Sequence, residues 1–102
     1  MQSFLANKET DDYAREEILD QYPAVAESAV LGQPDPVLGE RVVALLVPAS
    51  DHLEPTDVLA YSRDRLARYE VPQGLKVVDT IPHTAKGAID RTAALATYQR
   101  LS

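Results

Sequence analysis

Cysteine is absent from this 102-residue chain, and histidine occurs only at His52 and His83. Without a thiol the chain has no disulfide scaffold, no thiolate zinc site and no cysteine nucleophile. Two imidazoles so far apart in the sequence are also a poor basis for a metal centre. We therefore expect no metal site.

Long apolar runs are absent as well. The longest, residues 42–47, is ended by Pro48, whereas a membrane-spanning helix needs about 20 apolar residues. The N-terminus shows no signal peptide, because no basic start precedes an apolar block. Basic residues are few: 10 lysines and arginines face 16 aspartates and glutamates, for a net charge of −6. That balance argues against nucleic-acid phosphates as the main partner, so we expect a cytoplasmic protein that binds neither membranes nor nucleic acids.

Three common catalytic signatures are missing too. None of the five serines lies in a Gly-x-Ser-x-Gly turn. The four glycines do not form a dinucleotide-binding fingerprint, and the pair Lys86-Gly87 lacks the spacing of a phosphate-binding loop. His83 precedes this pair, and its position fits either a functional site or a simple exposed loop.

The residues that are present fit one globular domain, with 45% hydrophobic and 25% charged side chains. We expect residues 1–11 to form a flexible lead-in and residues 12–102 to form the domain. Asp11 and Asp12 are candidate caps for a helix over 12–21, since Ala14 and Ile18 recur at helical spacing and Leu19 adjoins them.

The remaining elements follow from the apolar pattern. Residues 25–31 and 40–47 are expected to be antiparallel strands, the second covered on both faces because its apolar run does not alternate. A third strand is expected over 75–78, with helices over 56–69 and 90–98. The side chains expected to pack on the sheet are Ala14, Ile18, Leu19, Val58, Leu59 and Leu66. The order αββαβα predicts an α+β fold: a small mixed three-stranded sheet with flanking helices.

Four ordered blocks resemble one family: Tyr22–Gly32, Pro34–Ala44, Leu66–Pro72 and Ile81–Arg91. Together they resemble the C-terminal domain of the adenylate-forming superfamily, which includes acyl-CoA synthetases, adenylation domains of nonribosomal peptide synthetases, and luciferases. The resemblance covers roughly residues 12–98.

The resemblance implies a lid domain. In that superfamily a carboxylate and ATP give an acyl-adenylate, and a thiol then takes the acyl group. The complete enzyme would use ATP with Mg, and either CoA or the phosphopantetheine of a carrier protein, but none of these would be bound by this domain alone. The partner would be an N-terminal adenylation domain, in the same chain or a separate one, which the lid covers to deliver a lysine. Alone, the domain would be inactive.

The sequence departs from the family motif Pro-x-Thr-x-x-Gly-Lys-Ile-x-Arg at the lysine. Counted from Pro82, the motif places Thr84, Gly87 and Arg91 in a loop near the partner's active site, but Ala88 stands at the lysine position. In an extended segment, residues i and i+2 point to the same side, so Lys86 is a candidate substitute. Gly87 between them leaves that direction open.

A second departure concerns the hinge, because residues 1–12 lack the family's Gly-Arg-x-x-Asp string. A free-standing lid, a degenerate end of a longer chain and a piece cut after the hinge, with its lysine replaced, all fit. The unrelated lead-in beginning with Met1 favours the first. We expect either the lid of an acyl-CoA synthetase or related adenylate-forming ligase, or a non-catalytic module that docks a carrier protein or partner synthetase.

Overall fold

The computed structural model describes residues 8–37, 39–50 and 52–101. The helices and strands, in chain order, are α1 (Lys8–Asp20), β1 (Val25–Asp35), β2 (Gly39–Pro48), α2 (Pro55–Arg65), the short 3₁₀ helix η2 (Arg68–Glu70), β3 (Gly74–Val77) and α3 (Arg91–Arg100). The predicted α+β order is confirmed. The expected lead-in lies outside the described residues up to residue 7, while residues 8–11 belong to α1. In the described part of the chain, no helix is long and apolar enough to span a membrane.

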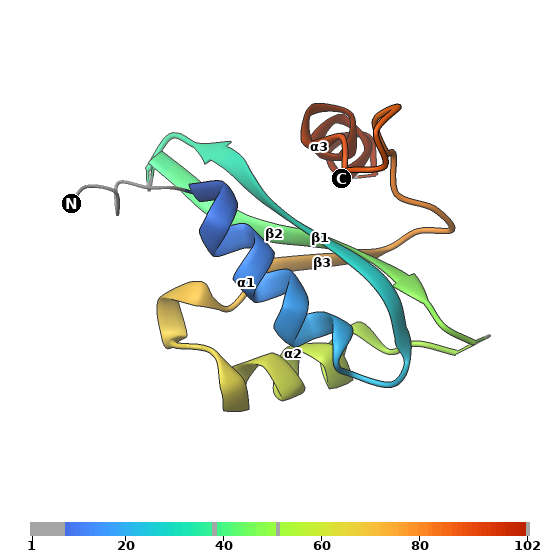
Figure 1. Ribbon diagram of the computed structural model, residues 1–102. Coiled ribbons are helices and arrows are strands. Elements are labelled where there is room, and N and C mark those ends of the chain that lie inside the picture. The colour runs from blue at the N-terminus through green and yellow to red at the C-terminus, as the bar shows by residue number, and fades with distance from the viewer. Residues whose placement is uncertain (1–7, 38, 51, 102) are drawn as a thin grey trace.

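The sheet has the strand order β1-β2-β3 (Figure 1). β1 and β2 pair antiparallel, with Val30 opposite Ala44. β2 begins at Gly39, which has a φ of 84°, a conformation that favours glycine. β3 pairs parallel to β2, with Val77 opposite Leu46, after the crossover through α2. The sheet is therefore mixed, as predicted, and the apolar run 42–47 lies in its central strand.

Helices cover both faces of this sheet (Figure 1). The central strand sends alternate side chains to opposite faces, so Val43 and Leu45 join one buried cluster, and Ala44 and Leu46 join the other. All four are fully buried. This explains the sequence pattern, because a strand that is buried on both faces has no polar alternation.

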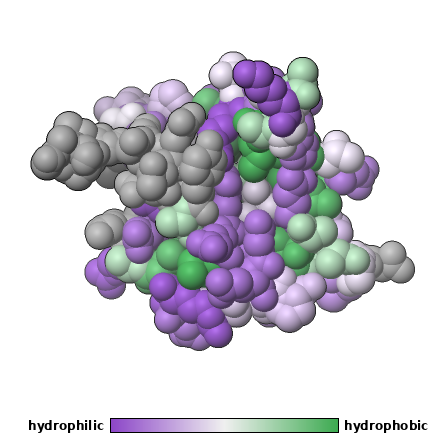
Figure 2. All heavy atoms as spheres, viewed as in Figure 1, coloured by the Kyte–Doolittle hydropathy of each residue, from purple (hydrophilic) through white to green (hydrophobic). Residues whose placement is uncertain are grey.

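α1 and α2 cover one face together. Leu19 of α1 and Val58 of α2 pack there against Val30 and Leu46, and the rings of Tyr22 and Tyr61 meet with their centroids 5.0 Å apart. Figure 2 shows hydrophilic side chains over the middle of the molecule, where α1 lies in Figure 1. α1 is therefore amphipathic, with its apolar side on the sheet.

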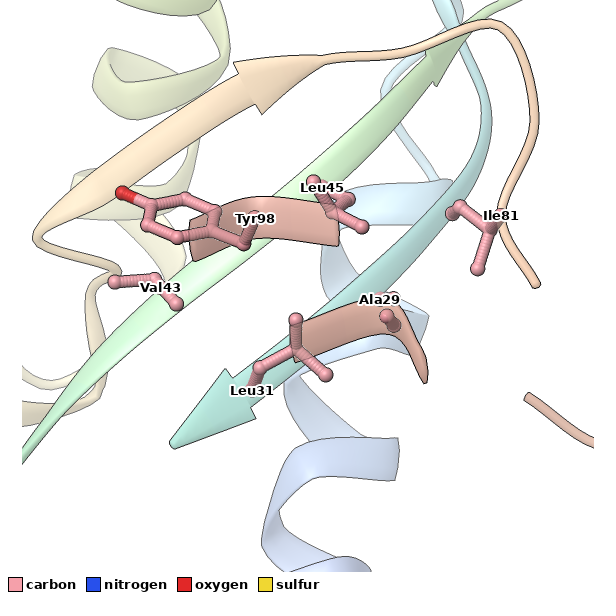
Figure 3. Close-up of a cluster of buried hydrophobic side chains, with 7 residues drawn as sticks. Ala29, Leu31, Val43, Leu45, Ile81 and Tyr98 are labelled. Atoms are coloured by element: carbon pink, nitrogen blue, oxygen red, sulfur yellow. The ribbon is translucent and has the colours of Figure 1, made fainter. Parts of the chain in front are cut away.

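α3 and the segment before it cover the opposite face. Tyr98 of α3 extends over β2 beside Val43 and Leu45, and Ile81 enters the same cluster from the segment that follows β3 (Figure 3). Gly74 lies so close to the Tyr98 hydroxyl that a Cβ at this position would collide with it. The absence of a side chain at Gly74 thus lets α3 approach the sheet.

The first helix differs from the prediction in its start and in its buried side. It begins at Lys8, so Asp11 and Asp12 lie within it and are not its caps. Leu19 is buried as predicted, but Ala14 is exposed and Ile18 is only half-buried, because α1 turns Glu16 to the sheet beside Leu19. Hydrophobic periodicity did not predict the buried side of α1 correctly, because that side contains the carboxylate of Glu16.

The second predicted helix, 56–69, is too long. α2 ends at Arg65, and Leu66 is already extended, with a φ of −116°. Leu66 therefore lies outside the helix and is half-buried. Within α2, Leu59 is half-buried too, whereas Val58 is buried as predicted. The last helix runs slightly beyond the predicted 90–98, and Asp90 caps it: its carboxylate accepts a hydrogen bond from the Ala93 N–H at 3.1 Å.

Candidate functional site

The segment between β3 and α3 contains four of the five residues that the sequence analysis assigned to a site, and the fifth, Arg91, is the first residue of α3. It is anchored at its ends by buried Ile81 and by the α3 cap Asp90. Between them it folds back on itself. The Asp90 N–H donates to the Pro82 carbonyl at 2.9 Å, and His83 and Ile89 form an antiparallel bridge. Residues 82–90 are thus a small hairpin, called the motif hairpin below.

The tip of the motif hairpin is a tight turn. The Thr84 N–H donates to the Ala88 carbonyl at 2.7 Å, and the Gly87 N–H donates back to the Thr84 carbonyl at 2.9 Å. The Lys86 N–H is 3.3 Å from the Thr84 hydroxyl. Gly87 has a φ of 90°, which explains a glycine there. Because the tip is a turn, the rule for extended segments does not relate Lys86 to Ala88.

Four of the five predicted site residues lie together at this tip. Thr84, Lys86, Gly87 and Ala88 are all exposed. The tip offers a partner one ammonium, that of Lys86, and the uncharged methyl of Ala88. No group of metal-binding side chains occurs in residues 8–37, 39–50 and 52–101.

Arg91, the fifth, lies apart from the tip. Its guanidinium forms a two-pronged ion pair with Glu16 of α1, at 2.7 Å from Nη1 to Oε2 and 3.1 Å from Nη2 to Oε1. Nη1 also donates to the Val30 carbonyl at 2.9 Å. The Arg91 side chain is only 19% exposed and that of Glu16 only 9%. Arg91 therefore points into the domain.

The other arm of the motif hairpin is held at the surface. His83 Nε2 lies 2.6 Å from Glu27 Oε2 of β1, and both side chains are more than a third exposed, at 37% and 36%. The sequence analysis missed both carboxylate partners, Glu16 and Glu27. The only local signal was the i, i+3 spacing of Glu16 and Leu19, which places both on one side of a helix.

A third carboxylate lies near these two. The Ser28 hydroxyl donates to Asp20 Oδ1 at 2.7 Å. Burial raises the pKa of the Asp20 carboxyl, and the negative charges of Glu16 and Glu27 add to that rise, while the hydrogen bond from Ser28 opposes it. The carboxylate of Asp20 is thus held in a place that disfavours its charge.

A groove lies away from the motif hairpin, between α2 and the segment before β3. It encloses about 640 Å³, and its lining residues are Leu59, Arg63, Leu66, Arg68, Val71, Pro72 and Gln73. Both arginines are exposed. The groove therefore combines apolar side chains with two positive charges, in a chain whose net charge is −6.

Comparisons with known proteins identify the family to which the chain belongs. The model of the AMP-binding enzyme C-terminal domain matches residues 15–88. A feruloyl-CoA synthase from an Amycolatopsis species is 42% identical over 69 residues, which are 67% of this chain and 14% of that protein. MatB from Rhodopseudomonas palustris, solved with bound ATP, has a TM-score of 0.80 and 30% identity over 88% of this chain and 18% of its own.

A further solved structure is the amide bond synthetase McbA from Marinactinospora thermotolerans. Its TM-score is 0.78, with 33% identity over 85% of this chain and 18% of its own. A variant of McbA with one lysine replaced by alanine matches at 34% over the same shares. The chain thus spans less than a fifth of the length of these relatives. It belongs to the family of AMP-binding enzyme C-terminal domains, whose relatives here are acyl-CoA ligases and other adenylate-forming enzymes.

Proposed function

We propose that this chain acts as the C-terminal lid of an acyl-CoA ligase. The motif hairpin carries the proposal, because it presents an exposed tip on a base that is fixed to the domain. In the complete enzyme a larger N-terminal domain, in the same chain or another, holds the carboxylate substrate and ATP. The tip closes over that site. By itself the lid is inactive.

In this proposal the motif hairpin does not bind a nucleotide by itself. The N–H groups of Thr84, Gly87 and Asp90 donate within the motif hairpin, so they are not available to cradle a phosphate. Lys86 supplies a single charge. ATP with Mg, and CoA or a carrier's phosphopantetheine, therefore belong to the complete enzyme in this proposal.

Ala88 stands where the family motif has its lysine. An ammonium at that place stabilises the negative charge that develops as the acyl-adenylate forms, and a methyl group cannot. We take position 88 as degenerate and Lys86 as an exposed residue without a catalytic role.

A domain exchange tests the proposal. This chain replaces the C-terminal domain of the feruloyl-CoA synthase relative, and ATP–pyrophosphate exchange is measured with that enzyme's own acid. Ala88→Lys should raise the exchange rate by about two to three orders of magnitude, the usual worth of one such charge contact. Lys86→Ala should change it little.

A matched control for the exchange is Ala85→Lys, which adds the same charge at another exposed tip position. It should not raise the rate. If Lys86→Ala abolishes exchange while Ala88→Lys adds nothing, Lys86 is the working lysine and our assignment of position 88 is wrong. If none of the three variants alters the rate, the lid proposal itself fails.

The groove beside α2 favours a second function, a docking module for a carrier protein or partner synthetase. Its two arginines and apolar lining suit an acidic protein surface with an apolar centre. Binding of an acyl-carrier protein should then weaken at least tenfold with Arg63→Glu and persist in Lys86→Ala. Arg100→Glu, at the exposed end of α3, is the charge-matched control. Equal binding by all variants would reject this second function.

A further inference from the structure

β1 is an edge strand whose outer polar groups need partners. Val30, in the middle of β1, has its N–H 2.7 Å from Glu16 Oε2 and its carbonyl 2.9 Å from Arg91 Nη1. An unpaired strand edge normally calls for such cover. At Val30 one ion pair supplies both partners. The Glu16 carboxylate accepts from the Val30 N–H, and the Arg91 guanidinium donates to the Val30 carbonyl.

The same ion pair joins the two layers that cover the sheet. Glu16 belongs to α1 on one face, and Arg91 begins α3 on the other (Figure 1). The Arg91–Glu16 pair therefore passes around the β1 edge. Both side chains are largely buried, so water screens the attraction little, and the paired geometry fixes the direction of the guanidinium.

Arg91 also directly follows the motif hairpin. Its neighbour Asp90 closes the hairpin on Pro82 and caps α3. The tip residues are exposed. The direction in which the tip points is therefore set at the base of the hairpin, where Arg91 holds the exit arm and His83 holds the entry arm.

We propose that Arg91 is a positioning residue: through Glu16 it fixes the orientation of the motif hairpin relative to the sheet. This rests on the proposed function, in which the tip must meet a partner's active site. A displacement of about 1 Å at a reacting group can cost about a hundredfold in rate. The Arg91–Glu16 ion pair is buried and two-pronged, so it restricts the orientation of the motif hairpin more than an exposed contact would.

The first test uses NMR on the full 102-residue chain and needs no catalysis. Backbone order parameters of the Thr84, Gly87 and Ala88 amides should be near 0.85 and should fall below about 0.6 in Arg91→Gln. The amides of β2 should keep their values. Arg65→Gln, an arginine that lies over Tyr61 and away from the hairpin, is the matched control and should change nothing at the tip.

Two further variants keep this test decisive if Arg91→Gln does not fold. Glu16→Gln retains an oxygen for the Val30 N–H but loses the charge, and Arg91→Lys retains the charge but loses the fork. Both should lower the order parameters of the tip amides relative to the unsubstituted protein, while those of the β2 amides stay unchanged. Tip amides that stay rigid in folded variants, or that loosen only as much as β2, would overturn the inference.

The second test separates this inference from the proposed function. In the domain exchange carrying Ala88→Lys, Arg91→Lys should lower kcat about tenfold while the KM for ATP changes less than twofold, because a tilted tip misplaces charge only where it reacts. Equal losses in both parameters would contradict the positioning role. An exchange enzyme in which Ala88→Lys has no effect rejects the proposed function, while the order parameters still decide the role of Arg91.

Discussion

The two arms of the motif hairpin are each held by a contact with a carboxylate, and the two contacts differ in burial. The exit arm has Arg91 with Glu16, which are buried, two-pronged and also bonded to a strand edge. The entry arm has His83 with Glu27, a single contact between side chains that are more than a third exposed. The shortest nitrogen–oxygen distances are similar, at 2.7 Å for Arg91–Glu16 and 2.6 Å for His83–Glu27. Burial, not distance, therefore decides what each pair contributes.

The largest effect should come from breaking the buried pair. Arg91→Leu leaves the Glu16 carboxylate buried without its counter-charge, which costs about 3–5 kcal/mol in the free energy of unfolding. Urea denaturation followed by circular dichroism measures this. A double variant with Glu16→Leu should recover the part of the loss that comes from the unpaired carboxylate, but not the part that comes from the Val30 N–H and carbonyl, which lose their partners. A loss below about 1 kcal/mol in Arg91→Leu would mean that the buried pair contributes no more stability than the exposed pair of His83 and Glu27.

The next largest effect should come from a substitution at Gly87, in the turn between the two arms. Gly87→Ala forces a side chain into a φ of 90°, which should cost about 1–2 kcal/mol. The space around Gly87 is open, so no collision adds to this. Gly87→Asn, a residue that tolerates positive φ better, should cost less. Thermal melts of the three proteins make the comparison, and an equal loss in both variants would argue against backbone strain.

Breaking the exposed pair should have a smaller effect. His83→Gln should lower stability by less than about 1 kcal/mol, because solvent screens an exposed pair. Whatever loss appears should shrink further between low salt and 1 M salt, where the screening length is about 3 Å. The loss from Arg91→Leu should hardly depend on salt. Equal salt dependence in the two variants would remove the contrast between the arms.

The smallest effect concerns Asp20, near the carboxylates of both pairs. Its raised pKa means that the folded state binds its proton more tightly than the unfolded state, so stability falls as pH rises through the range above 3.8. Asp20→Asn removes that cost and keeps an oxygen for the Ser28 hydroxyl. We expect a gain of a few tenths of a kcal/mol at pH 7, discounted for the exposure of this side chain, and no gain at pH 3. Denaturant midpoints at the two pH values test this.

The sequence predicted what depends on neighbouring residues. The unbroken apolar run of β2 indicated burial on both faces, and Asp90 followed by a helical segment indicated a cap. It could not predict the Arg91–Glu16 pair, whose members are 75 positions apart, because no local pattern links them. For the same reason Ala14 was wrongly expected in the core in place of Glu16. Gly87 left the direction of the tip open, and only the fold reveals a turn there.

The central strand has a consequence for how the domain unfolds. β2 supplies Val43 and Leu45 to one apolar cluster and Ala44 and Leu46 to the other. If β2 leaves the sheet, side chains of both clusters therefore become exposed to water. Partial opening of one face is therefore penalised by both. We infer that amides of β2 exchange with solvent only through global unfolding, so that the two sides of the sheet melt as one cooperative unit.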